Sequence, residues 1–330
     1  MHENVYIENK LIVSLFYSID RIGVPLFFML SGGLILPKIV NTNIITFYKK
    51  RIPQFFILII VWSIITNFSK GILDGNSIKV SFLNAIPYNG IYPGSYYPAA
   101  HMWFMYAIIQ LYLIAPFLAK LLDKLSNYNI FLFLFIGILL NQLKVDMIYF
   151  LEKLGWGGGE TLQRFGSDFV GPYVIYFILG YLIIHRNIFS NIRNLRKYLY
   201  YFLLLIIPIM ATVYIDFKAN NIEGIFHWYS TSIPILVSSV GLIFLIRDYL
   251  EKIESFLYSK YITLISICSF GIYLSHYAFI FLCMKLLKVS SLNIENTSIL
   301  MIVYFIFSFC GGLLLTYLMM KNKLTRYFVA

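Results

Sequence analysis

The chain places an acid and a base, Asp20 and Arg21, directly before an apolar run that is long enough to enter a lipid bilayer. The run reads VPLFFMLSGG and includes Ser31. A charge at the edge of a membrane segment is costly to desolvate, so it usually has a function. An arginine there can offset negative charge that develops during a reaction. The alternative is that Arg21 only anchors the helix, with its stem in the apolar layer and its head in water.

Histidines are the second set of residues whose side chains could do chemistry. An imidazole near its reference pKa of about 6.5 can take a proton from a hydroxyl at neutral pH. His276 lies within an apolar segment and His101 stands at the entrance to another. A titratable ring inside a membrane bundle is a functional candidate by default, and a hydrogen-bonded packing histidine is the alternative. His185 and His227 flank apolar segments, and His2 follows the first residue, so their neighbours alone assign them no role.

Composition decides which kind of scaffold must position these residues. Of the 330 residues, 60% are hydrophobic and only 12% are charged, with a mean hydropathy of +0.77. No soluble globular domain could bury so much apolar surface in one core. The chain is therefore expected to be an integral membrane protein.

The apolar segments indicate helices rather than barrel strands. A helix needs roughly 20 residues to cross the hydrocarbon layer, and runs such as FLFLFIGILL lack the period of two that a membrane strand requires. We therefore expect an all-α fold, a polytopic transmembrane helical bundle of about nine spans. The expected spans are Ile22 to Leu36, Ile52 to Ile72, Met102 to Leu122, Tyr128 to Leu140, Val170 to Ile184, Tyr198 to Ile215, Thr231 to Ile246, Ile262 to Met284 and Ser298 to Met320.

The loops between the spans indicate the orientation. Lys and Arg are retained on the cytoplasmic side, and when alternate loops are assigned to two faces, nearly the whole net charge of +11 falls on one of them. This places the C-terminus in the cytoplasm and residues 1–20 outside. Residues 74–100 and 142–169 then form outer loops. The first is rich in Tyr, Gly and Pro, so its rings could stack on sugars, although an interfacial aromatic belt has the same composition.

Several functional classes are excluded or disfavoured. The basic residues are scattered among helix-flanking loops, which favours membrane lipids with anionic headgroups as partners and argues against nucleic acid. The cysteines Cys268, Cys283 and Cys310 lie within expected spans and form no CxxC pair, so neither a disulfide framework nor a metal site is expected. The sequence also lacks a Gly-rich phosphate loop and a GxSxG nucleophile elbow.

Five motifs give the chain a resemblance to a known family. They are RIGVPLFFMLSG from Arg21, FYKKRIP from Phe47, HMWFMY from His101 followed by LYLIAP from Leu111, YFILGY from Tyr176, and SFGIYLSH from Ser269. In this order, and over nearly the whole chain, they resemble the membrane-bound acyltransferase 3 family.

The resemblance implies an activity and a location. Members typically move an acetyl group from cytoplasmic acetyl-CoA to a hydroxyl of a cell-surface glycan or of its lipid-linked precursor, at the cell membrane. Acyl-CoA is then a co-substrate, and no metal is needed. Members have about ten helices, each long enough to span the bilayer, with both termini inside. Residues 1–330 are accordingly expected to form one acyltransferase domain that lacks the first helix of the family.

That first helix ordinarily carries a basic residue followed, eleven positions later, by a histidine regarded as catalytic. Nothing in the sequence matches the basic residue. His2 stands where such a helix would end, so it is the candidate for that histidine, and residues 1–20 would be a remnant or an outer segment. The simplest hypothesis is a misplaced start codon or a truncated gene. A truncated gene would make the chain an inactive remnant.

His2, Arg21 and His276 are the catalytic candidates. A histidine can remove the proton of the acceptor hydroxyl as attack begins, and His276, inside a span, could instead be an intermediate station for a relayed acyl group. Arg21, with Asp20 beside it, would orient the thioester and offset the developing oxyanion.

Two binding sets complete the expected site. The phosphates of acyl-CoA are expected on Lys49, Lys50 and Arg51, although Gln54 replaces the second arginine of the Arg-x-x-Arg element of the family. Contact with the acceptor is expected from Asp20, Ser31, His101, Trp103 and Tyr106.

A polysaccharide exporter or flippase is the rival interpretation. A transporter should carry charged or broken-helix elements at mid-membrane in several spans, whereas most ionisable residues of this chain lie at span ends. This difference favours the enzyme. The donor is cytoplasmic while Arg21 and His101 lie toward the outside, so the acyl group or the pantetheine arm must reach through the bundle, with transfer either direct or relayed.

Overall fold

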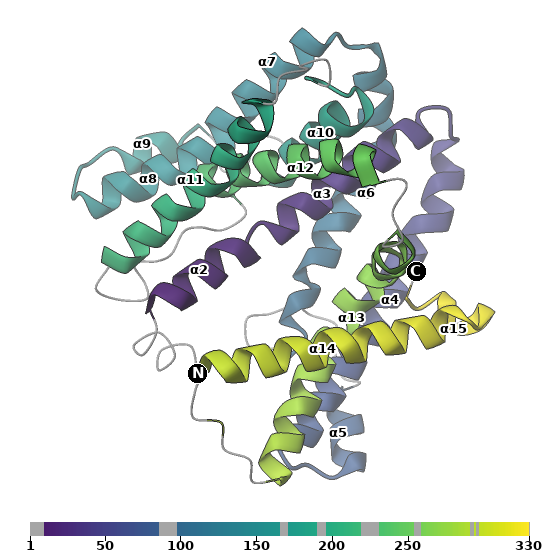
Figure 1. The fold of residues 1–330 in the computed structure, drawn as a ribbon. Coiled ribbons are helices and arrows are strands. Elements are labelled where there is room, and N and C mark those ends of the chain that lie inside the picture. Colours follow the sequence, from purple (N-terminus) through teal and green to yellow (C-terminus); the bar gives the residue numbers. More distant parts are fainter. Residues whose placement is uncertain are drawn as a thin grey trace. The chain divides into compact units, whose positions relative to one another are not determined.

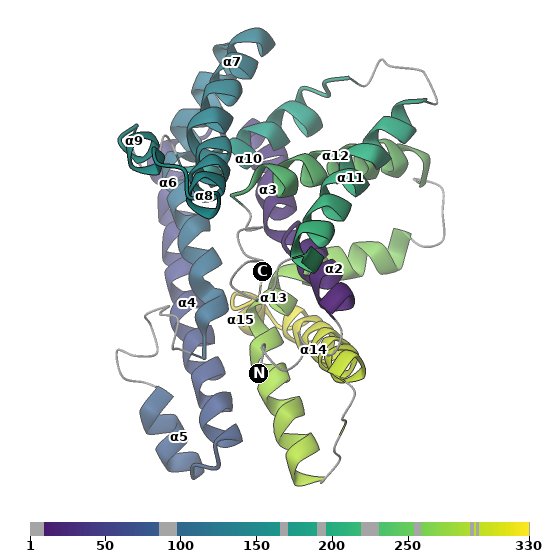
Figure 2. The same cartoon turned by 90° about the vertical axis from the view of Figure 1, so that its left-hand side faces the viewer.

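The computed structural model describes residues 10–85, 98–165, 171–189, 196–218, 231–253, 259–290, 294 and 297–329. Every regular element in these ranges is a helix, and Figures 1 and 2 show them in two views. The elements are α2 (Lys10–Asp20), α3 (Gly23–Ile39), α4 (Ile44–Leu73), α5 (Ile78–Ala85), η2 (Ala100–Met102), α6 (Trp103–Lys124), α7 (Asn127–Ile138), η3 (Leu139–Leu143), α8 (Lys144–Lys153), α9 (Gly159–Gln163), α10 (Pro172–Gly180), η4 (Tyr181–His185), α11 (Arg196–Lys218), α12 (Ile233–Ile253), α13 (Ser259–Val289), α14 (Thr297–Met320) and α15 (Lys323–Arg326).

Each of the nine expected spans coincides with a helix. Seven helices within the described ranges are long and apolar enough to cross a membrane: Ser14–Ile39, Ile44–Leu73, Ala100–Lys124, Asn127–Glu152, Arg196–Ile215, Lys260–Val289 and Ile299–Met320. The span expected from Val170 is the shorter apolar helix Pro172–His185, and the span expected from Thr231 is α12. The predicted fold class, an all-α polytopic bundle, is confirmed.

Several spans are longer than the sequence suggested, and the first and the fourth differ most. The first begins at Ser14 rather than Ile22, because only a turn at Arg21 and Ile22 separates α2 from α3. The fourth continues from α7 through the π-helix η3 into α8 and ends at Glu152, so residues 142–153 of the expected outer loop are helical. Polar residues in this stretch resemble a loop in sequence, yet the side chains of Gln142, Lys144 and Asp146 are buried within the helical structure.

The described chain divides into two compact units. The first unit comprises Met1–Ile44 and Leu113–Glu254, and the second comprises Ile45–Tyr112 and Ser255–Ala330. The boundary at Tyr112 falls inside α6, so that helix contributes its first half to the second unit and its second half to the first.

The centre of the first unit is a close crossing of α3 and α10. A side chain on Gly32 of α3 would overlap the backbone carbonyl of Phe177, and one on Gly180 of α10 would overlap the carbonyl of Met29. Small residues at a membrane helix crossing let two backbones approach, which gains dispersion contacts where no hydrophobic driving force is available. Phe177 and Met29 are accordingly fully buried.

The helices α2, α11 and α12 form a second contact region of the first unit. The hydroxyls of Ser18 and Thr212 lie 2.9 Å apart and hydrogen-bond between α2 and α11, and both side chains are fully buried. Beside them Ile22, Ile209 and Ile235 belong to one apolar cluster. The pairing of hydroxyls is expected here, since an unpaired polar group in a membrane interior is costly.

Two arginines anchor the C-terminal end of the π-helix η4 within the first unit. Arg186 donates to the Tyr181 hydroxyl at 3.1 Å and to the carbonyls of Leu122 at 2.9 Å and Leu125 at 3.3 Å. Those carbonyls lie at the end of α6, where a cation also complements the helix dipole. Arg186 therefore ties η4 to the end of α6.

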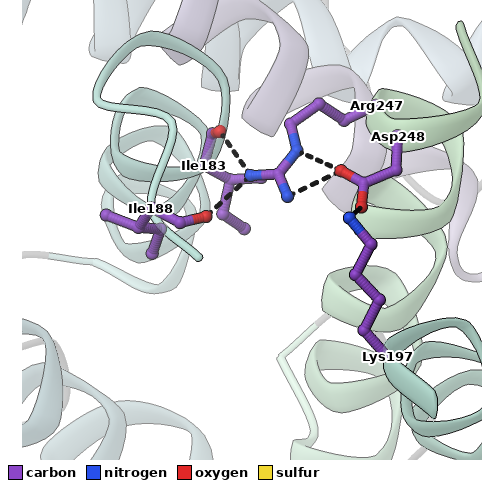
Figure 3. Close-up of polar contacts among 5 residues, drawn as sticks. All are labelled: Ile183, Ile188, Lys197, Arg247 and Asp248. Atoms are coloured by element: carbon purple, nitrogen blue, oxygen red, sulfur yellow. Dashed lines mark hydrogen bonds and ion pairs between the residues drawn. The ribbon is translucent and has the colours of Figure 1, made fainter. Parts of the chain in front are cut away.

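Arg247 makes the second anchor, together with Asp248 and Lys197 (Figure 3). Its Nη1 donates to the carbonyls of Ile183 at 3.2 Å and Ile188 at 2.7 Å, and its Nε donates to Asp248 at 2.8 Å. Lys197 on α11 lies 2.6 Å from the other carboxylate oxygen. Asp248 is only 4% exposed and holds both cations, so this ion-pair network joins η4, α11 and α12.

The second unit is built on α13 and α14, which cross in Figure 1. Gly271 and Gly312 lie at this contact, against Thr316 and Ser275 respectively. At the C-terminal end of the chain the carbonyl of Phe328 accepts a hydrogen bond of 2.8 Å from the indole of Trp62 on α4. Trp62 and its neighbours are almost fully buried, so the residues that follow α15 are part of the packed structure of this unit.

Candidate functional site

His101 lies in the second unit, in the short 3₁₀ helix η2 that opens α6. Its side chain is 7% exposed. Its Nε2 lies 3.4 Å from the carbonyl of Leu274 on α13, and its own backbone carbonyl accepts a 2.7 Å hydrogen bond from the hydroxyl of Tyr273. Both the ring and the backbone of His101 are therefore attached to α13, a helix far away in the sequence.

His276 lies beside His101 on α13. The two imidazole rings meet edge to face, with centroids 4.9 Å apart and an interplanar angle of 76°. The Nδ1 of His276 hydrogen-bonds to the carbonyl of Tyr273, one turn earlier in the same helix. The two histidines that the sequence singled out inside or beside apolar segments thus lie in contact.

Aromatic side chains enclose the pair. The ring of His101 stacks on Tyr277, with centroids 4.4 Å apart at 13°, and Tyr277 also meets His276 edge-on at 4.9 Å. Tyr273 lies 5.8 Å from His101 and 5.1 Å from Phe104. We call His101, Tyr273, His276 and Tyr277 the histidine cluster.

The sequence of α13 explains why one helix can hold this cluster and still pack on α14. Tyr273, His276 and Tyr277 are spaced three and four residues apart, which places them on one face of the helix. Gly271 and Ser275 face α14 instead. The motif SFGIYLSH therefore encodes two faces, one of small residues for helix packing and one of aromatic rings around a histidine.

Carbonyl contacts fix the tautomer of each histidine. A carbonyl oxygen can only accept a hydrogen bond, so the nitrogen that faces it must carry the proton. In His101 this is Nε2, facing Leu274, and in His276 it is Nδ1, facing Tyr273. In the neutral rings the lone pair is therefore on Nδ1 of His101 and on Nε2 of His276.

The other residues expected to contact the acceptor are divided between the units. Trp103 and Tyr106 follow His101 on α6, with Trp103 39% exposed and Tyr106 partly buried. Asp20 and Ser31 belong to the first unit, where Asp20 is exposed at the end of α2 and Ser31 is partly buried on α3. The structure therefore brings His101 to His276 within the second unit, and Asp20 and Ser31 belong to the first unit.

Arg21 contacts Tyr17 within the first unit. Its Nη2 donates to the Tyr17 hydroxyl, and its guanidinium carbon lies 4.3 Å from the centre of the same ring. A cation above an aromatic face is stabilised by the ring quadrupole. Tyr17, one helical turn before Arg21, is thus a partner that sequence reasoning did not identify, and the spacing of four residues is the signal that could have shown it.

The basic residues expected to bind acyl-CoA lie near the start of α4. Lys49, Lys50 and Arg51 are all exposed, whereas Gln54 is buried. Exposed cations on consecutive helical positions can meet an anionic phosphate group from solvent. His2, the third catalytic candidate, lies outside the described residues.

Sequence reasoning missed two buried charges of the first unit. Lys144 and Asp146 are 6% and 7% exposed within the long fourth span. Asp146 accepts a 2.8 Å hydrogen bond from the backbone N–H of Ile233, the first residue of α12. A carboxylate at that position satisfies an orphan donor and complements the helix dipole. The role of Asp146 is therefore to fix the start of α12.

Among the residues with described positions, no three His, Cys, Asp or Glu side chains lie together in a way that could hold a metal ion.

The family of the chain follows from its similarity to known proteins. A family model described as an acyltransferase domain matches residues 2–321, which is nearly the whole chain. The chain belongs to the acyltransferase 3 family. No protein of curated function and no solved structure matches it.

The motifs by which the sequence resembled the acyltransferase 3 family meet in pairs within the units. In the first unit, the glycines of VPLFFMLSGG and YFILGY form the crossing of α3 and α10. In the second unit, HMWFMY meets SFGIYLSH at the histidine cluster. Phe47 of FYKKRIP stacks on Tyr112 of LYLIAP at 5.8 Å. Two of these pairs are packing contacts between apolar or small residues, and only the histidine cluster joins groups that can exchange protons.

Proposed function

We propose that this membrane acyltransferase moves an acyl group, most simply acetyl, from cytoplasmic acyl-CoA to a hydroxyl of a cell-surface or lipid-linked polysaccharide. The observation that carries the proposal is the contact between His101 and His276 in an enclosed aromatic setting. The residues 1–330 act as one domain in the cell membrane, with the C-terminus on the cytoplasmic side.

His276 is the proposed base. A sugar hydroxyl is a poor nucleophile, and removing its proton as attack begins lowers the barrier. The Nδ1 proton of His276 is held by the carbonyl of Tyr273, so Nε2 has the lone pair that accepts the hydroxyl proton. The hydroxyl oxygen forms a bond to the acyl carbon, the carbon–sulfur bond of the thioester breaks, and His276 returns the proton to the departing thiolate.

The remaining candidates have supporting roles. Arg21 would offset the negative charge that develops on the acyl oxygen, with Asp20 beside it. Lys49, Lys50 and Arg51 would hold the phosphates of acyl-CoA, and the exposure of all three is in keeping with that role. Ser31, Trp103 and Tyr106 would contact the acceptor, and His2 is a second candidate base.

The experiment is to measure the acyl content of envelope glycan by mass spectrometry in cells that lack the gene and carry either the wild type or a variant. We expect wild type to add acyl mass to the glycan and His276→Gln to abolish the addition. His185→Gln is the matched control, because His185 is an exposed histidine at the end of η4 and has no proposed role. It should behave as wild type.

Two outcomes would refute the proposal. If His276→Gln restores full acylation, His276 is not the base. If wild type changes the amount of surface glycan and leaves its acyl content unchanged, the chain acts in polysaccharide export and not in acyl transfer.

A further inference from the structure

The Nδ1 atom of His101 is a buried acceptor that has no partner in the part of the chain that the structure describes. The side chain is 93% buried, as its 7% exposure implies, and the tautomer set by Leu274 leaves the lone pair on this nitrogen. A buried acceptor without a hydrogen bond lowers stability, because its desolvation is not compensated. Such a group calls for an explanation, and a ligand that donates a hydrogen bond to it is one.

Contacts with α13 hold His101 in place. Its backbone carbonyl accepts from Tyr273, its Nε2 donates to Leu274, and its ring stacks on Tyr277. These contacts leave the ring little freedom to turn and satisfy Nδ1 elsewhere. The residue is thus attached at three points, and the one polar atom that remains unsatisfied lies in the ring that touches His276.

We infer that Nδ1 of His101 accepts a hydrogen bond from a second hydroxyl of the acceptor sugar, while His276 takes the proton of the hydroxyl that is acylated. This inference rests on the proposed function and deepens it. One hydroxyl has one proton and cannot satisfy two lone pairs, so a ligand that serves both histidines must present two O–H donors. The acceptor class is therefore a sugar with at least two free hydroxyls close together.

Two substitutions separate ligand binding from structural support. The amide nitrogen of Gln reaches the position of Nε2, so His101→Gln preserves the donor to Leu274 and removes the acceptor at Nδ1. The amide of Asn reaches only the position of Nδ1, so His101→Asn preserves an acceptor there and loses the bond to Leu274. If His101 has only a structural role, Gln should preserve the KM for glycan better than Asn does. If Nδ1 binds the ligand, Asn should preserve that KM better than Gln does.

The test uses the full chain in liposomes, labelled with ¹⁵N at histidine, and envelope glycan from cells that lack the gene. Addition of the glycan should move the signal of the unprotonated Nδ1 of His101, which is identified by its loss in His101→Gln. Glycan that has been methylated on every hydroxyl is the matched control and should leave the signal in place.

The variants are compared by melting and by acyl-transfer assays. His101→Gln should keep the thermal midpoint of wild type and raise the KM for glycan about threefold to tenfold, the range for one lost hydrogen bond. His101→Asn should melt lower and keep a KM near that of wild type.

The outcomes distinguish the inference from the function on which it rests. If transfer occurs, the Nδ1 signal stays in place and His101→Gln keeps the KM of wild type, the inference is overturned and the function stands. If no transfer is detected and the native glycan still moves the signal, the function fails and the binding role of His101 is supported. An equal shift with native and methylated glycan would overturn the hydroxyl contact.

Discussion

Gly32 on α3 lies directly against the backbone carbonyl of Phe177 on α10. The relationship is reciprocal, because Gly180 on α10 lies against the carbonyl of Met29 on α3. Each glycine belongs to a motif by which the sequence was placed in its family. The glycines of these motifs therefore allow two membrane helices to approach closely, and packing rather than chemistry explains their presence.

Substitution of Gly32 or Gly180 by alanine should destabilise the first unit. The added methyl group has no space, so α3 and α10 must move apart and lose contacts, at about 1–3 kcal/mol for each substitution. The thermal midpoint of purified protein in detergent measures the effect. Gly157→Ala is the control, because nothing lies within 4 Å of a Cβ built there. Midpoints of Gly32→Ala and Gly157→Ala that both equal the wild-type value would contradict the close crossing.

Replacement of Asp248 by asparagine should weaken the same unit through electrostatics. Asp248 lies beyond the expected span Thr231 to Ile246 and holds Lys197 and Arg247. Removing the buried carboxylate leaves both cations without their counter-ion, which typically lowers the free energy of unfolding by about 3–5 kcal/mol. Glu160→Gln changes an exposed carboxylate and should have little effect. Equal thermal midpoints of Asp248→Asn and Glu160→Gln would show that the network contributes nothing to stability.

Asp248 also predicts how stability depends on pH. Burial alone would raise the pKa of its carboxyl, but hydrogen bonds from Lys197 and Arg247 outweigh burial and hold the pKa below its usual value. The stability that this group contributes is therefore fully present above the unfolded pKa of about 3.9 and is lost as the pH falls through the lower folded pKa. The thermal midpoint should therefore fall less steeply at acid pH in Asp248→Asn than in wild type. An identical pH dependence of the thermal midpoint in the two proteins would mean that the carboxyl is not ion-paired.

The C-terminal residues should be coupled to α4 through Trp62. Trp62 is 1% exposed and donates to the carbonyl of Phe328 at 2.8 Å. Trp62→Phe removes this hydrogen bond and part of a well-packed ring, and we expect a loss of about 1–3 kcal/mol. Trp156→Phe is the matched control, because Trp156 is 65% exposed. A larger fall of the thermal midpoint in Trp156→Phe than in Trp62→Phe would contradict this coupling.

The sequence predicted the helices well because composition and apolar run length are local properties. The limits of the fourth span were missed for a tertiary reason. Lys144 and Asp146 interrupt its apolar pattern, and only the backbone N–H of Ile233, far away in the chain, explains how Asp146 can be buried in a helix. A local pattern cannot show a partner of that kind.

The residues of the candidate site could be predicted from the sequence, but their arrangement in space could not. His101 and His276 stood out because a titratable ring is unusual in apolar surroundings. Their contact could not be foreseen, since it joins η2 to α13 across most of the chain. Tyr277 was missed although its spacing of four residues from Tyr273 places both rings on one helical face. Arg247 and Asp248 lie beyond the end of an expected span, and their network depends on the ends of η4 and α11.

Acyl transfer from acyl-CoA to glycan is the central claim, and one reconstituted reaction tests it most directly. The full chain in liposomes is supplied with acetyl-CoA labelled in the acetyl group, and with envelope glycan from cells that lack the gene. The account predicts that label enters the glycan as an ester in equal amount to the coenzyme A released, and that His276→Gln abolishes both while His185→Gln abolishes neither. Release of coenzyme A without label in the glycan, or full transfer by His276→Gln, would contradict it.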